Sequence, residues 1–74
     1  MNLKTNLESG AVVSTVLLPM MHPGGIYETM VFPAPGNWRD LDCQRYHTET
    51  DAIAGHEAMV ARWQDRPIPE EEND

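Results

Sequence analysis

The chain has 74 residues, of which 12 are acidic and 5 are lysine or arginine, so its formal net charge is −7. A chain of this length supports one domain at most, and its thin core argues against a self-contained enzyme with a deep pocket. The acidic balance argues against general nucleic-acid binding, which needs a basic stripe. The single cysteine, Cys43, excludes an internal disulfide framework. A core this small usually needs support from a metal or from self-association.

The two ends of the chain differ from its middle in composition. Residues 1–10 are polar and are expected to form an N-terminal arm, either loose or with one short helical turn. Residues 67–74 combine two prolines with a run of acids, a composition that predicts a disordered tail. The single folded domain is therefore expected over residues 11–66.

Three strands are expected in chain order. Residues 11–20 are rich in β-branched residues and carry apolar side chains on both faces. Residues 26–32 form the second strand, which lies between two turns rich in proline and glycine. Residues 41–47 form a weaker and more polar third strand, which suits the edge of a sheet.

A helix is expected after the third strand. Thr48 is its predicted N-cap, and Asp51 stands three residues later, where a capping box places an acid. Pro67 ends the helix because it disfavours helical geometry at Arg66. One apolar stripe is expected to cover the sheet, and its members are Ala52, Ile53, His56, Met59, Val60 and Trp63. The predicted fold is therefore α+β, a three-stranded antiparallel meander with one C-terminal helix packed on one face.

Self-association is predicted from the surfaces that one helix cannot cover. Both faces of the first strand are apolar, and one helix covers only one of them. The opposite side of the helix carries a strip of alanines, which either permits close approach of another helix or simply favours helix formation. The predicted interface residues are Val13, Thr15, Leu17, Ala54, Ala58 and Ala61.

A first candidate site lies where the first loop and the end of the third strand meet in a meander. Glycine N–H groups, imidazoles and the start of the helix would come together there, and these are the components of an anion site. Ordinary turn chemistry is the alternative interpretation. The predicted binding residues at this end are His22, Gly24, Gly25, Tyr46 and His47.

A second candidate site is the connection between the second and third strands, which contains Trp38 outside any periodic element. A loop tryptophan either folds back as a lid on a small core or is presented to a partner. In the second case Trp38 and Arg39 form a hot-spot pair. Both residues are therefore predicted to bind a partner.

Patterns that would support catalysis or metal binding are weak. His56 falls within the apolar stripe and is expected to be a core or interface histidine with one ring nitrogen bonded to the backbone. Glu28 is expected to pair across strands with Arg45, and Cys43 is expected to be structural. The sequence has no His-Glu-x-x-His or Cys-x-x-Cys spacing, so no metal or cofactor is expected.

Two blocks of the sequence support a resemblance that covers about half of the chain. The first block is residues 14–18, then His22, then Tyr27-Glu28-Thr29-Met30-Val31-Phe32. The second is Arg45-Tyr46-His47-Thr48, then Ala54-Gly55-His56, then Met59-Val60. In order and spacing these blocks resemble a family of small uncharacterised proteins of tailed bacteriophages and prophages. The resemblance implies no catalytic residues, and it implies the setting of a phage accessory protein that binds host factors.

The expected function is that of a non-enzymatic phage-type accessory protein. It would block or sequester a host factor, either a protein or a small nucleotide-like ligand, and so counter host defence as a homo-oligomer in the host cytoplasm. Neither a signal peptide nor a membrane span is expected, because the longest apolar run is far shorter than about 20 residues. The alternatives are a small metal-dependent or nucleotide-cleaving enzyme using His22, His47 and Glu28, and a minor virion structural protein.

Overall fold

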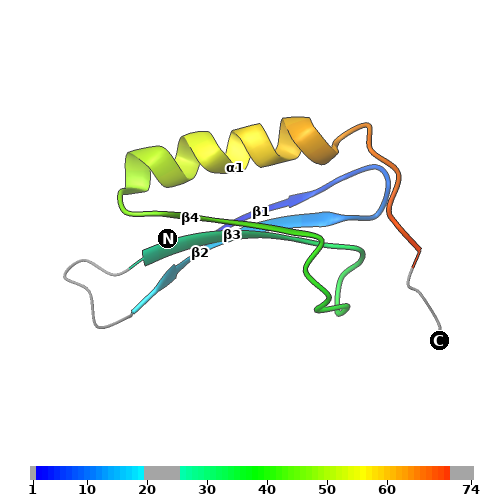
Figure 1. Cartoon of the computed structure of the whole chain (residues 1–74), viewed down its shortest axis with the longest axis horizontal. Coiled ribbons are helices and arrows are strands. Elements are labelled where there is room, and N and C mark those ends of the chain that lie inside the picture. Colours follow the sequence, from blue (N-terminus) through cyan, green and yellow to red (C-terminus); the bar gives the residue numbers. More distant parts are fainter. Residues whose placement is uncertain (1, 20–25, 71–74) are drawn as a thin grey trace.

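The computed structural model describes residues 2–19 and 26–70 of the chain. In this part of the chain the fold is α+β, a four-stranded antiparallel sheet with one helix packed on one of its faces (Figure 1). The elements are β1 (Asn2–Asn6), β2 (Val12–Leu18), β3 (Ile26–Phe32), β4 (Asp42–Tyr46) and α1 (Glu49–Trp63). The strands lie in the sheet in chain order, so the topology is a meander. The antiparallel meander and the C-terminal helix confirm the predicted fold class, with one strand more than predicted.

The additional strand is β1, so the prediction of a loose N-terminal arm was wrong. β1 pairs along its whole length with β2, and a short turn joins the two strands. In this turn the N–H of Leu7 donates to the carbonyl of Ala11 (2.8 Å), and Gly10 adopts a φ of 99°, which favours glycine. Asparagine and lysine are poor strand formers, so the strand depends on its pairing with β2 rather than on local preference.

Alternation of side chains gives the sheet two different faces. The face beneath α1 includes the fully buried pairs Val13–Val31 and Thr15–Thr29, each directly opposite its partner on the neighbouring strand. Val13 and Thr15 are therefore closed to a second copy of the chain, which corrects their prediction as interface residues. Leu17, at the end of the same row, stays 37% exposed.

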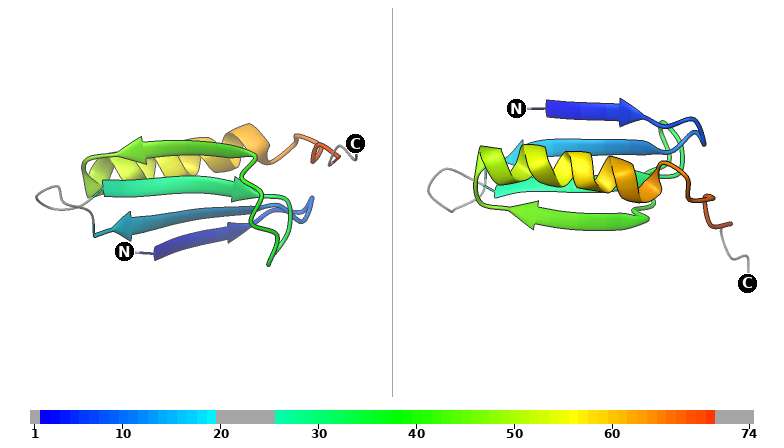
Figure 2. Two further views of the ribbon diagram at one scale, coloured as in Figure 1. Left: turned by 60° about the horizontal axis from the view of Figure 1, so that its bottom comes forward. Right: turned by 90° about the horizontal axis from the view of Figure 1, so that it is seen from above.

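The opposite face of the sheet, here called the helix-free face, has no helix among the described residues. Its side chains belong to the alternate positions of the four strands, and they include Lys4, Val12, Ser14, Val16, Leu18, Glu28, Met30, Phe32, Cys43 and Arg45. The left view of Figure 2 looks toward this side of the sheet. The apolar members lie mainly on the two central strands, and most of them are only half-buried.

Helix α1 begins where the sequence predicted and ends before Pro67. The side chain of Thr48 accepts a hydrogen bond from the N–H of Asp51 (3.1 Å), which confirms the N-cap. The helix ends at Trp63, and Arg66 lies outside it, as the position before Pro67 predicted. The Arg66 guanidinium lies over the Trp63 ring at 4.8 Å. Most of the predicted stripe is buried or half-buried, but Ile53 is 41% exposed.

The C-terminal end of α1 is fixed to β4 and to the segment that follows. The Asp42 carboxylate accepts hydrogen bonds from the Trp63 indole (2.9 Å) and from Arg62 (3.0 Å). The indole bond is the main reason why the pKa of Asp42 lies below its usual value. Residues 67–70, predicted as part of a disordered tail, are described by the structure, and Ile68 packs against the core cluster around Met59 and Trp63.

Candidate functional site

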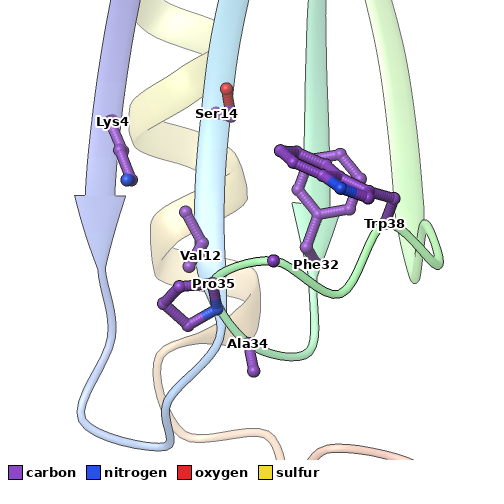
Figure 3. A pocket seen from close by; sticks show the side chains of 8 residues that line it. Lys4, Val12, Ser14, Phe32, Ala34, Pro35 and Trp38 are labelled. Carbon is purple, nitrogen blue, oxygen red and sulfur yellow. The ribbon is translucent and has the colours of Figure 1, made fainter.

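A pocket of about 170 Å³ lies on the helix-free face, where the connection between β3 and β4 folds over the end of the sheet. Val12 and Ser14 of β2 and Phe32 of β3 line it from the sheet. Pro35 and Trp38 close it from the connection, and Lys4 of β1 adds a cation (Figure 3). The pocket is therefore mostly apolar, with one positive charge.

The connection holds Trp38 in place through a tight turn. The N–H of Asn37 donates to the carbonyl of Ala34 (3.1 Å), and Gly36 adopts a φ of 82°, which a residue with a Cβ rarely adopts. The side chain of Asn37 in turn accepts a hydrogen bond from the N–H of Arg39 (3.1 Å). These bonds on either side of Trp38 restrict its backbone.

Trp38 is 78% exposed, although it contacts the sheet. Its ring meets the ring of Phe32 edge to face, with 5.3 Å between the ring centres and an angle of 83°. This contact fixes the indole but leaves most of its surface open to solvent. Of the two interpretations of Trp38, the exposure favours presentation to a partner over a lid on the core. Tryptophans in such positions are common anchors of protein interfaces.

Arg39 does not join Trp38 at the pocket. Its guanidinium donates to the carbonyl of Pro69 (2.9 Å), which ties the connection to the segment after α1. Its Nε is buried and has no hydrogen-bond partner among the described residues. The structure therefore gives Arg39 a different position from the one that the predicted hot-spot pair requires.

On β3 and β4, the helix-free face carries an ion pair and the cysteine. Arg45 donates to the Glu28 carboxylate at 2.9 Å, which confirms the predicted pair. Cys43 is exposed, so packing in the core does not account for it. Although the residue is exposed, partial desolvation of its sulfur, with a contribution from the nearby Glu28 charge, raises the pKa of the Cys43 thiol. A thiol with a raised pKa is a poor nucleophile.

The other predicted site lies at the opposite end of the sheet. His22, Gly24 and Gly25 lie outside the described residues. His47 is exposed directly after β4, and Tyr46 is half-buried against α1, where burial raises the pKa of its phenol. Among residues 2–19 and 26–70, no group of three or more histidine, cysteine or acidic side chains is placed to hold a metal ion.

A buried chain of hydroxyl groups around His56 is the feature that the sequence did not predict. His56 Nε2 is hydrogen-bonded to the Thr5 hydroxyl (2.9 Å), and Nδ1 to the Thr15 hydroxyl (2.7 Å). Thr15 is in turn bonded to the Thr29 hydroxyl (2.6 Å). The expected bond from His56 to the backbone was wrong, since both ring nitrogens bond to threonines. The network joins α1 to three strands, with Thr15, Thr29 and His56 buried and Thr5 half-buried, so its role is structural.

We expect His56 to make the stability of the fold depend on pH. Burial lowers the pKa of His56 below its usual 6.5, against a smaller opposing effect of Glu57. As the pH falls through about 6.5, the unfolded chain takes up a proton that the folded chain still resists, so the free energy of unfolding falls. The loss stops once the pH is below the folded pKa as well. Urea unfolding between about pH 7.5 and about pH 5 measures this slope.

The matched control for this pH dependence is the exposed His47. His56→Gln removes the slope in this range, whereas His47→Gln retains it. An unchanged slope in His56→Gln would show that another group is responsible.

Comparison of the chain with protein-family models, with curated proteins and with solved structures found no match. Within residues 2–19 and 26–70, no helix combines the length and apolar character needed to cross a membrane.

Proposed function

We propose that the chain is a non-enzymatic accessory binding protein of the phage type, which works as a homodimer in the host cytoplasm and blocks a host protein. The observation that carries this proposal is Trp38, fixed on Phe32 above a sheet face without a helix and still 78% exposed. An exposed tryptophan with a fixed ring supplies large contact area at low entropic cost. The resemblance of the sequence to small phage proteins supports the setting.

The occupant of the helix-free face in this proposal is a second copy of the chain. Val16, Leu18, Met30 and Phe32 form a half-buried apolar stripe along its two central strands. A chain of this size buries too little surface to leave such a stripe open, and two sheets that pack face to face cover each other. The face measures about 20 Å by about 20 Å, so its contact area is at the low end for interfaces and we expect a weak dimer.

Sedimentation of the purified protein tests the dimer. We expect the wild-type chain to form a dimer at tens of micromolar, while Trp38→Ala and Met30→Lys sediment as monomers because they remove the anchor or charge the stripe. Ala58→Lys adds the same charge on the exposed side of α1 and is the control. A wild-type monomer of 8.4 kDa at this concentration would contradict the proposal.

The same variants decide between two interfaces. Ala54, Ala58 and Ala61 all lie exposed on α1, so self-association through this predicted strip remains testable. Loss of the dimer in Ala58→Lys, with retention in Met30→Lys, would assign the interface to the helix instead of the helix-free face.

Plating of phages tests the action on a host. Bacteria that produce the wild-type chain are expected to plate a phage that their defences restrict more efficiently than bacteria that produce Trp38→Ala. Equal plating, with both proteins present in equal amounts, would argue against a role in countering defence.

A further inference from the structure

Helix α1 leaves one strand of the sheet uncovered on its own side. The helix packs on β2, β3 and β4. Seen from above in Figure 2, β1 lies beside α1 rather than beneath it. A helix is about 10 Å wide and neighbouring strands are about 4.8 Å apart, so one helix cannot cover four strands. A second helix that would complete this layer is not among the described elements.

An apolar trough runs along this uncovered strand. We call it the β1 trough and define it by Leu3, Leu7, Leu17, Ile53 and Val60. Leu3 and Leu7 stand on the helix side of the β1 hairpin, since Leu3 lies opposite the buried Thr15. Ile53 and Val60 are seven residues apart on α1 and therefore share one side of the helix.

The side of α1 that faces β1 is established by two observations. His56, one turn after Ile53, reaches Thr5 of β1 with its hydrogen bond of 2.9 Å. Val60, one turn further, lines a hollow of about 330 Å³ together with Thr5 and Leu7. Ile53 and Leu17 are among the large apolar side chains that remain exposed. The trough thus combines apolar side chains with the polar Asn6 and Gln64, which also line the hollow, and the Thr5 hydroxyl beside them is already bonded to His56.

The rim of the β1 trough is acidic. Glu8 and Asp65 line the hollow, and Glu57 is exposed on α1 one residue after His56. The two ion pairs of the described residues are Glu28–Arg45 and Asp42–Arg62, so these three acids are not neutralised by pairing. A partner on this rim needs positive charge. A second copy docked trough to trough is disfavoured, because the same acids would then face each other.

We propose that the β1 trough binds an amphipathic helix of a partner protein, with apolar residues in the trough and lysine or arginine along its flanks. The helix would lie where a second helix of this fold would cover β1, in the helix-in-groove mode. This inference rests on the proposed function as a binding protein and assigns the partner a surface distinct from the helix-free face.

Titration with a synthetic 18-residue peptide tests the inference. The peptide contains leucine and lysine only, arranged to form an amphipathic helix, and a peptide of the same composition with scrambled order is the control. We expect the first peptide to shift the backbone amide signals of residues 3–7, 17 and 53–60, and the scrambled peptide to bind at least about tenfold more weakly. Binding should weaken as the salt concentration rises, because the rim contributes.

Matched variants separate the trough from general attraction of charge. Ile53→Gln alters an exposed apolar residue of the trough and should weaken peptide binding about tenfold, while Ala58→Gln introduces the same residue at an exposed position outside the trough and should not. Equal binding of both peptides, or unchanged binding by Ile53→Gln, would overturn the inference. If Ile53→Gln dissolves a dimer, a second copy occupies the trough, which also overturns it.

The outcome is independent of the dimer proposal. Trp38→Ala and Met30→Lys lie on the opposite face of the sheet and should bind the peptide as the wild-type chain does. Peptide binding by a chain that never dimerises would reject the homodimer and retain the trough. Signal shifts confined to the helix-free face would reject the trough and retain that face as a binding surface.

Discussion

Replacing Gly55 with alanine will destabilise the fold by about 2 kcal/mol, although alanine is the better helix former. Gly55 is buried on the side of α1 that faces β4. A Cβ built on it would overlap the phenol ring of Tyr46, most closely at the Cζ atom. The helix would have to lift or the ring would have to leave its half-buried position, and both lose contacts between α1 and the sheet. Thermal unfolding should show a loss of about 10 °C for a domain of this size.

Two further variants test the cause of this loss. In Gly55→Ala combined with Tyr46→Ala the overlap is absent, so the added alanine should no longer destabilise the chain and should give back up to about 1 kcal/mol through helix propensity. Ala54→Gly, at an exposed neighbouring position, should cost about 1 kcal/mol through helix propensity alone. If Gly55→Ala proves more stable than the wild-type chain, the close approach of Tyr46 is not a constraint on α1.

The elements with strong local signals could be predicted from the sequence. β3 has the predicted bounds, because its strand formers lie between two segments of the sequence that are rich in proline and glycine. Thr48 caps α1 as predicted, since a capping box depends on residues three positions apart. The pair Glu28–Arg45 followed from the meander once β3 and β4 were expected as neighbours.

What depends on tertiary contacts could not be predicted in the same way. β1 consists of asparagine, lysine, leucine and threonine, and only its hydrogen bonds to β2 make it a strand. Because β1 was not predicted, Thr5 was not placed in the sheet, and the partner of His56 Nε2 could not be predicted either. The sequence did contain one signal for this network: a histidine within the apolar stripe, and threonines at buried positions of two strands. Their alignment required the register of three strands.

The candidate site around Trp38 also combines features that local sequence predicts with features that depend on tertiary contacts. Proline, glycine and asparagine around Trp38 predicted a connection outside the periodic elements, which is correct. They did not predict that the connection folds onto the helix-free face and places Trp38 against Phe32. Local composition predicts that a turn forms, whereas the direction in which it folds is set by the face of the sheet that the helix leaves open.

Replacing Thr15 with valine will cost about 3 kcal/mol, the largest loss that we expect from a change of nearly constant volume. The Thr15 hydroxyl is bonded both to His56 Nδ1 and to the Thr29 hydroxyl, and Thr15 and Thr29 are fully buried. Valine fills the same space but leaves these two polar groups without a partner. Buried polar groups without partners cost about 1–3 kcal/mol each. In a chain of this length such a loss is a large part of the total stability.

Thr15→Ser is the control that separates the hydroxyl from the methyl group. Serine keeps an oxygen that can bond to both neighbours and loses only one methyl group, at a cost of about 1 kcal/mol. Urea unfolding at neutral pH should therefore order the three proteins as wild type, then Thr15→Ser, then Thr15→Val. If Thr15→Val equals or exceeds Thr15→Ser in stability, the core gains more from apolar contact than from its hydrogen bonds. Helix α1 would then be held on the sheet by Met59 and Trp63 rather than by the threonines around His56.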